Sequence, residues 1–206
     1  MTVRRHEPVA WLEIAMENYL RCSEYIDCNH PDVVSLARWL ADGAESDHDV
    51  AKKCYEWVRD NIRHSWDFRL NPVTCRASDV LRHKTGYCYA KSHLLAALLR
   101  ASNIPAGLCY QRLSLEGNGA PYCLHGLNAA YLRDYDWYRM DARGNKDGVN
   151  AGFDPPRERL AFAVTEKLER DFPEIRPEPL PAVIKALTEN HSFLAVYQNL
   201  PDMAII

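Results

Sequence analysis

The sequence predicts an α+β protein whose strands lie in its second half. Helical spacing of apolar residues fills the first half of the 206-residue chain, and segments with strand-like alternation follow. Between them, a strongly apolar stretch from Cys88 to Asn103 predicts one central helix. Apolar residues cover most of its circumference, so we expect it inside a core, with a narrow polar edge formed by Lys91, Ser92 and Arg100. Helices that precede antiparallel strands are typical of α+β folds.

The helices before the centre are predicted from apolar spacing and capping residues. They are expected at residues 9–21, 33–43 and 47–61. Ser46 suits the N-cap of the last of these, and Pro31 suits a first helical position. The stretch from His64 to Cys75 is predicted to be a loop, and a short helix capped by Ser78 is expected after it.

The segments after the central helix are predicted to be strands joined by turns. The expected strands cover residues 106–113, 124–132 and 137–142, with a tight turn at 133–136 between the last two. Beyond them we consider a helix at 157–162, a proline-rich surface segment at 173–181 and a terminal helix at 182–190. The whole chain, 1–206, is predicted to form one domain. Its core covers about 46–145, with an N-terminal helical extension at 9–45 and a C-terminal extension at 146–206.

Composition excludes several classes of partner. A formal net charge of −3 gives no electrostatic reason to expect binding to nucleic acid or to an anionic membrane. No apolar run approaches the roughly 18 residues that a membrane span needs. The first twenty residues carry charges where a signal peptide would be apolar, so we expect a cytoplasmic protein.

The cysteines are expected to be reduced thiols. There are seven of them, an odd number without paired spacing, at positions 22, 28, 54, 75, 88, 109 and 123. Cys22, Cys28 and His30 lie close enough in sequence to consider zinc. There is no Cys-x-x-Cys and no second half-site, so no metal is expected, and no other cofactor either.

Cys88 stands at the expected start of the central helix. There, unpaired backbone N–H groups and the positive end of the helix dipole converge. Such a position stabilises a thiolate and offers a backbone N–H to an oxyanion. Taken alone, Cys88 would more often be a buried structural cysteine, so its interpretation depends on a partner base.

His125 and Asp141 are candidates for that partnership. A hairpin between their strands places Asp141 opposite position 127 or 128, and a three-residue loop would put it on the face of His125. The sequence leaves this register open. His64 is the rival histidine, whereas His93 lies too far around the helix from Cys88. Arg143, which follows Asp141, either lines a substrate opening or belongs to a solvated glycine-rich loop.

Three segments of the sequence resemble the core of the transglutaminase-like superfamily. They are GYCYAKSHLLAALLRASNIPAG, LHGLNAAYL and WYRMDARG, and the resemblance covers residues 60 to 145. It implies a papain-like Cys–His–Asp triad on a helix packed against an antiparallel sheet. Carried onto this sequence, Cys88 is the nucleophile, His125 the base and Asp141 the orienting group.

The resemblance also implies a candidate oxyanion donor, and it has limits. Trp66 matches a tryptophan whose indole N–H serves the oxyanion in animal transglutaminases. Position 127 is Leu where the superfamily often has Trp, and the calcium-site extensions of animal transglutaminases are missing. Protein cross-linking is therefore not implied, and the chain is more similar to bacterial thiol peptidases and amide hydrolases of this superfamily.

Together these residues predict an enzyme that cleaves a peptide, isopeptide or other amide bond through an acyl-Cys88 intermediate. Its substrate would be a peptide, a protein or a small amide. Transfer of the acyl group to an amine would use the same residues, and acetyl transfer in the manner of arylamine N-acetyltransferases is a related possibility. The alternative from another class is a non-catalytic module that keeps the fold to bind a partner.

Overall fold

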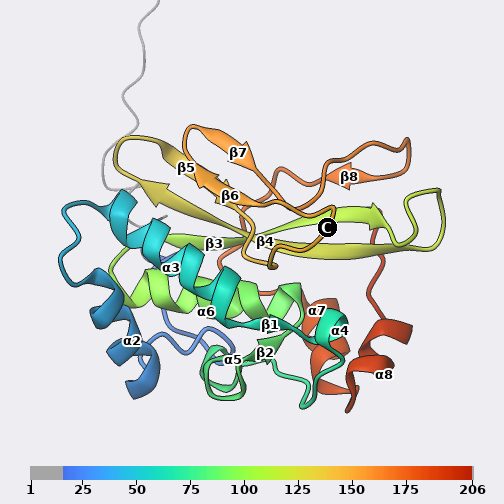
Figure 1. The fold of residues 1–206 in the computed structure, drawn as a ribbon, viewed down its shortest axis with the longest axis horizontal. Coiled ribbons are helices and arrows are strands. Elements are labelled where there is room, and N and C mark those ends of the chain that lie inside the picture. The colour runs from blue at the N-terminus through green and yellow to red at the C-terminus, as the bar shows by residue number, and fades with distance from the viewer. Residues whose placement is uncertain (1–15, 206) are drawn as a thin grey trace, which may run out of the picture.

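The computed structural model describes residues 16–205, in which a curled antiparallel sheet lies over a buried helix (Figure 1). The helices are α2 (Pro31–Ala41), α3 (Asp47–Asn61), α4 (Ser65–Phe68), α5 (Ala77–His83), α6 (Cys88–Ala101), α7 (Pro181–Thr188) and α8 (Phe193–Gln198). The strands are β1 (Arg63–His64), β2 (Thr85–Gly86), β3 (Ala106–Ser114), β4 (Tyr122–Leu132), β5 (Asp136–Met140), β6 (Gly152–Asp154), β7 (Arg157–Arg159) and β8 (Arg170–Asp171). Helices first and antiparallel strands afterwards confirm the predicted α+β class.

The central helix α6 is buried more completely than the sequence indicated. Its residues from Cys88 to Arg100 are all buried, because β3 and β4 cover one side and α2, α3 and α5 cover the others (Figure 1). The predicted polar edge is therefore wrong. Lys91, Ser92 and Arg100 are inside, and their polar atoms bond to backbone carbonyl groups, such as those of Ile62, Cys88 and Ala106 respectively. These bonds offset the desolvation of the polar groups.

The end of α6 follows from one residue in the left-handed region. Asn103 has φ +59°, and its N–H donates to the Arg100 carbonyl at 3.0 Å. The next N–H, of Ile104, reaches back to the Leu99 carbonyl at 2.9 Å. This pair of bonds is a Schellman motif, which stops the helix before Pro105 and starts β3.

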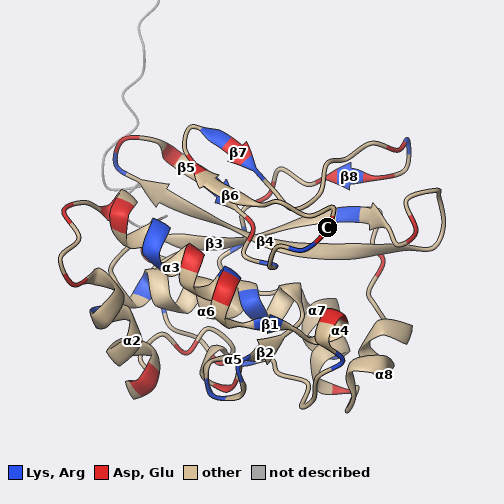
Figure 2. Cartoon of the chain, in the orientation of Figure 1, with Lys and Arg blue, Asp and Glu red and all other residues tan. Residues whose placement is uncertain are grey.

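The N-terminal elements are largely as predicted. Helix α3 begins after Ser46, whose side chain accepts a hydrogen bond from the Asp49 N–H at 3.1 Å. Helix α2 begins with Pro31, as expected. Acidic and basic residues alternate along α3 (Figure 2). The helix expected at 9–21 falls mostly outside the described residues.

Three local predictions are wrong because the residues pair with other segments of the chain. The stretch 64–75 is not all loop, since β1 pairs in parallel with β2, placing His64 beside Gly86, and α4 follows. Ser78 does not cap α5, which begins at Ala77, and its N–H donates instead to Asp27 at 3.1 Å. Residues 157–162 form no helix, because β7 pairs with β6.

The main sheet has the strand order β5-β4-β3-β8. In the β4–β5 hairpin Leu132 pairs with Asp136 and Asn128 with Met140, so three residues form the loop. Asp136 has φ +54°, the left-handed residue expected after a three-residue loop. Of the two registers that the sequence left open, this one places residue 141 opposite 127.

The C-terminal segment closes one side of the molecule. Helix α7 matches the predicted terminal helix, but α8, whose N-cap is Ser192, was not anticipated. Helix α8 packs against α4, and the chain beyond it reaches β4, where the Leu124 N–H donates to the Pro201 carbonyl at 2.8 Å. Among the described residues, no helix has the length and apolarity that crossing a membrane requires.

The expectation that all cysteines are reduced is wrong. Cys22 and Cys28 form a disulfide with 5.1 Å between their Cα atoms, and the five other cysteines are free. A bend at residues 24–26, in which the N–H groups of Ser23 and Cys28 both donate to the Ile26 carbonyl, brings the two cysteines together, which sequence spacing alone did not indicate. Their bond also removes both from the zinc site that was considered.

Candidate active site

Cys88 occupies the first position of α6. The N-cap residue, Tyr87, makes no side-chain capping hydrogen bond, so its side chain leaves the first-turn N–H groups free. Gly86 comes just before, where a β-carbon would stand 3.0 Å from Ala90 and 3.2 Å from the Thr74 hydroxyl. The absence of a side chain at Gly86 therefore lets the chain pass close to α6 and to Thr74 just before the helix begins.

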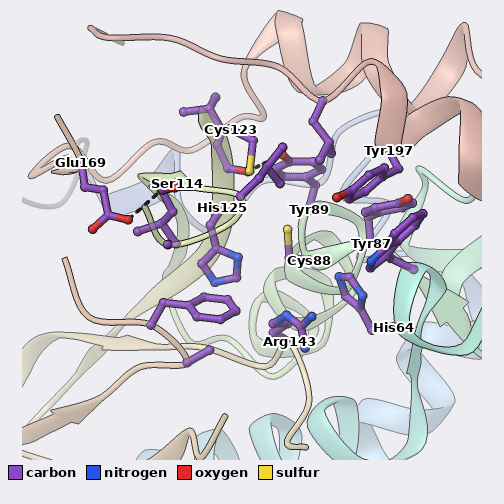
Figure 3. A pocket seen from close by; sticks show the side chains of 18 of the residues that line it. His64, Tyr87, Cys88, Tyr89, Ser114, Cys123, His125, Arg143, Glu169 and Tyr197 are labelled. Carbon is purple, nitrogen blue, oxygen red and sulfur yellow. Dashed lines mark hydrogen bonds between the residues drawn. The ribbon is translucent and has the colours of Figure 1, made fainter. Parts of the chain in front are cut away.

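Strand β4 crosses the start of α6 at Tyr89. The Tyr89 hydroxyl donates a hydrogen bond to the Leu124 carbonyl. Tyr89 follows Cys88 and Leu124 precedes His125, so this bond joins α6 to β4 right beside both candidate site residues. Gly126 and Asn128 face α6, so alternation along β4 puts His125 on the other face of the strand, and its ring comes to lie beside the end of the helix that carries Cys88. Figure 3 shows the His125 ring facing the Cys88 sulfur across the mouth of the site.

His125 and Asp141 form a buried hydrogen-bonded pair. The Nε2 atom of His125 lies 2.7 Å from Oδ2 of Asp141, and both residues are at most 4% exposed. The pair depends on the hairpin register, which places both side chains on one face of the sheet. Because Nε2 is engaged, Nδ1 is the ring nitrogen left for the thiol.

The electrostatics of this pair favour a charged imidazole. Burial lowers the pKa of His125. The charges of Asp141 and Cys88, together with the hydrogen bonds that the imidazole makes to these two residues, outweigh burial and raise the pKa to about 10. Burial raises the pKa of Asp141, but His125 and two backbone N–H groups outweigh it, so the pKa is lowered overall. An imidazolium beside a thiol is the form that stabilises a thiolate.

Two backbone donors hold the Asp141 carboxylate in place. Its Oδ1 accepts from the Arg143 N–H at 3.1 Å, and its Oδ2 accepts from the Ala161 N–H at 3.0 Å. Ala161 comes from the C-terminal part of the chain, and its neighbour Phe162 meets the His125 ring edge-on at 5.1 Å between ring centroids. No sequence motif indicated either residue.

A cavity of about 540 Å³ opens beside the thiol (Figure 3). Its lining comes from four parts of the chain: 64–66, 87–89, 113–125 and 143–200. Three of the four predicted site residues line the cavity, namely Cys88, His125 and Trp66. The fourth, Asp141, is fully buried behind His125. The structure thus brings the predicted residues together in one place.

Trp66 forms part of an aromatic wall. Its ring stacks on Tyr197 of α8, with centroids 3.5 Å apart and planes 5° apart, and the Arg69 guanidinium lies 3.7 Å from the Trp66 ring centroid. This stacking fixes the indole at the cavity edge. Whether its N–H serves an oxyanion stays a prediction.

The rival histidine, His64, also lines the cavity. Its Nδ1 lies 3.5 Å from Oδ2 of Asp67 rather than against the thiol. Burial, and then the charge of Arg143, hold the pKa of His64 well below its usual range, despite the opposing effect of Asp67. At neutral pH it is therefore an uncharged imidazole, unlike His125.

Residues that could hold a metal are not gathered in the described part of the chain. Between residues 16 and 205, no cluster of three or more His, Cys, Asp or Glu side chains has a suitable arrangement. The groups around Cys88 are instead those of an acid–base pair and a nucleophile.

A cysteine at the start of a buried helix, facing a histidine and an aspartate on an antiparallel sheet, defines a papain-like fold. Residues 34–142, more than half of the chain, match the sequence profile of the transglutaminase-like superfamily. The chain belongs to that superfamily. A search of curated proteins finds no match.

Several solved structures resemble the chain at low sequence identity. A candidate cysteine protease from Cytophaga hutchinsonii is 23% identical, with a TM-score of 0.52 over 66% of this chain and 45% of that one. The periplasmic domain of TgpA from Pseudomonas aeruginosa is 18% identical, with a TM-score of 0.46 over 63% of this chain and 47% of that one. Red sea bream transglutaminase is 13% identical, with a TM-score of 0.38 over 62% of this chain and 26% of that one. The chain thus spans less than half the length of each of these proteins.

Proposed function

We propose that the protein is a thiol-dependent acyl-transfer enzyme that cleaves a peptide, isopeptide or other amide bond. The observation that carries the proposal is the 2.7 Å hydrogen bond between His125 and Asp141 beside the Cys88 thiol. Membership of the transglutaminase-like superfamily supports it, and so does the fold shared with a candidate cysteine protease.

The first half of the reaction forms an acyl-enzyme. The Cys88 thiolate attacks the substrate carbonyl carbon, and the resulting oxyanion accepts hydrogen bonds from the Cys88 backbone N–H and the Trp66 indole N–H. His125 then gives its Nδ1 proton to the leaving amine, the C–N bond breaks, and an acyl-Cys88 thioester remains. Asp141 keeps the ring oriented and stabilises the imidazolium.

The second half returns the enzyme to its starting state. His125, now neutral, takes a proton from water or from an amine, and the activated nucleophile attacks the thioester carbonyl carbon. The C–S bond then breaks, which releases the acyl product and restores the Cys88 thiolate beside the protonated His125. Water gives hydrolysis, whereas an amine gives transfer to a new amide. All groups that these steps need are side chains and backbone N–H groups, so the proposal includes no metal and no cofactor.

A cytoplasmic location stays a prediction, and the Cys22–Cys28 disulfide argues against it, because disulfides persist mainly in oxidising compartments. No interaction with nucleic acid or membrane is part of the proposed function.

A direct test uses an activated ester, p-nitrophenyl acetate, and mass spectrometry. We expect a burst of nitrophenol and an acetyl group on Cys88, both lost in Cys88→Ala and retained in the matched variant Cys123→Ser, whose cysteine also lines the cavity. Added hydroxylamine should capture the acetyl group as a hydroxamate. Acetylation spread over several cysteines, or unchanged in Cys88→Ala, would favour the alternative of a non-catalytic binding module.

A further inference from the structure

One end of the cavity beside Cys88 carries an excess of positive charge. Arg143 and Lys146 both line the cavity, and both pair with the same carboxylate, that of Asp67. In Figure 3, Arg143 lies below the Cys88 sulfur, between His125 and His64. The guanidinium therefore borders the space that a substrate of Cys88 would fill.

Arg143 is held rigidly at this position. It is 7% exposed, and its backbone N–H donates to Asp141. Its Nη2 donates to Asp67 Oδ1 at 3.1 Å, and the Phe162 ring centroid lies 5.4 Å from its guanidinium carbon. These contacts fix the guanidinium before any substrate arrives.

The guanidinium of Arg143 has N–H donors that its contacts with Asp67 do not use. An arginine carries five N–H donors. The Nη1 atom of Arg143 is buried and lies 2.8 Å from Asp67 Oδ2, yet it makes no hydrogen bond of good geometry to any residue between 16 and 205. The N–H groups of Arg143 that Asp67 does not engage are therefore left for an acceptor that enters the cavity.

The charges around Asp67 do not cancel. Burial raises the pKa of Asp67, but hydrogen bonds from Arg143 and Lys146 lower it to about 2, so it carries one negative charge against two positive ones. His64, which also faces Asp67, is neutral at pH 7 because its pKa is well below its usual range. Lys91, packed behind this end, has a pKa that burial lowers to about 7, so at pH 7 it is only partly protonated and any charge that it carries is positive as well.

The other carboxylates of the site are already engaged. Asp141 bonds to His125 and to two backbone N–H groups. Glu169, across the cavity in Figure 3, accepts from the backbone N–H groups of Ser114, Thr165 and Glu166. The excess positive charge is thus concentrated at the Arg143 end.

We propose that Arg143, assisted by Lys146, binds a carboxylate of the substrate, so that the enzyme prefers amides with an anionic group close to the scissile carbonyl. This inference rests on the proposed function and names its substrate class. The fork of a guanidinium matches a carboxylate, and its fixed position makes it the specificity-determining group. Lys146, whose side chain is 47% exposed, adds a mobile point charge at the rim.

The test compares two alkylating reagents of similar size, anionic iodoacetate and neutral iodoacetamide, on the folded protein. The measured quantity is the ratio of their rates at Cys88, with the site of modification confirmed by mass spectrometry. The ratio isolates recognition of the carboxylate, because any change in the nucleophilicity of Cys88 alters both rates together. Unfolding temperatures show whether each variant is folded.

We expect Arg143→Gln to lower the iodoacetate/iodoacetamide ratio about tenfold, the size of one lost charge-assisted hydrogen bond. Lys146→Gln should lower it by a smaller factor, and Asp67→Asn should raise it, because the two cations lose their internal partner. The matched control is Arg63→Gln, which removes a neighbouring positive charge outside the cavity and should leave the ratio nearly unchanged. Lys146→Gln, on an exposed side chain, keeps the test valid if a buried variant does not fold.

The possible failures are distinguishable. If Cys88 reacts readily but the ratio is the same in wild type, Lys146→Gln and Arg143→Gln, the carboxylate site is overturned while the proposed function stands. If Cys88 does not react selectively with either reagent, the proposed function itself fails. A fall of both rates in Arg143→Gln with an unchanged ratio would overturn the inference too, since it would assign Arg143 to thiolate stabilisation.

Discussion

Gly126 of β4 lies directly against Tyr89 of α6. A β-carbon at position 126 would stand 2.9 Å from Tyr89 Cδ1 and 3.2 Å from Tyr89 Cα. Each of these residues is the chain neighbour of a proposed catalytic residue, since Gly126 follows His125 and Tyr89 follows Cys88. The absence of a side chain at 126 therefore sets how closely the imidazole approaches the thiol.

Gly126→Ala should separate the strand from the helix. The extra methyl group meets backbone atoms of Tyr89, which cannot rotate away, so we expect a stability loss of about 1–3 kcal/mol. We also expect a clear loss of Cys88 alkylation at pH 6. Gly43→Ala is the matched control: Gly43 has φ +65° and no neighbour within 4 Å of an added β-carbon. That control should lose about 1 kcal/mol by backbone strain and keep its alkylation rate. Equal alkylation in both variants would contradict the account.

His125 should stay protonated through neutral pH. Its pKa in the folded protein is raised to about 10, above the usual 6.5. Its contribution to stability is therefore complete below about pH 6.5 and is lost as the pH rises through about 10. The lowered pKa of Asp141 contributes stability above the usual 3.8, which is lost as the pH falls below that value.

A proton NMR titration measures this charge state. The His125 C2 proton signal, assigned by its absence in His125→Gln, should not shift between about pH 5 and 8. Asp141→Asn removes the negative charge that raises the pKa of His125, so in that variant the signal should titrate at a lower pH than in the wild type. A wild-type midpoint near 6.5 would show that the pair does not hold the proton.

His64 and His125 should differ in their effect on the thiol. His125→Ala removes the proposed base and should lower the rate of Cys88 acylation by about 10²–10⁴-fold. His64→Gln should retain most of that rate, because His64 is neutral and its Nδ1 faces Asp67. Acylation by p-nitrophenyl acetate under identical conditions measures both. A larger loss in His64→Gln than in His125→Ala would exchange the two assignments.

The Cys22–Cys28 disulfide predicts a specific thiol count. Without reduction, the denatured protein should show five thiols with a chromogenic disulfide reagent, and seven after reduction. Closing so short a loop in the unfolded chain contributes about 2 kcal/mol, so Cys22→Ser with Cys28→Ser should lower the unfolding free energy by about that amount. Seven thiols before reduction would show that the bond does not form.

Local patterns predicted much of this fold. The Ser46 cap, the apolar helix ending near Asn103 and the β4–β5 hairpin all follow from neighbouring residues in the sequence. The hairpin is the instructive case, because alternation allowed two registers. The left-handed Asp136, which closes a three-residue loop, selects the register that brings Asp141 onto the face of His125.

Long-range partners could not be predicted in this way. The donor to Asp141 from Ala161, the stacking of Trp66 on Tyr197 and the pairing of β1 with β2 join residues that are 20 to 131 positions apart. No periodicity within a segment indicates such contacts. The same reason hid the role of Arg143, whose position depends on Asp67, 76 residues earlier in the chain.

The central claim is that Cys88 is held ready as a nucleophile by His125. The most direct measurement is alkylation of the native protein with iodoacetamide at pH 6, with mass-spectrometric mapping of the five free cysteines. Cys88 should be modified first and almost alone, since burial raises the pKa of Cys54, Cys75, Cys109 and Cys123 to about 12. His125→Ala should abolish this selectivity. Uniform modification, or modification only after denaturation, would contradict the claim.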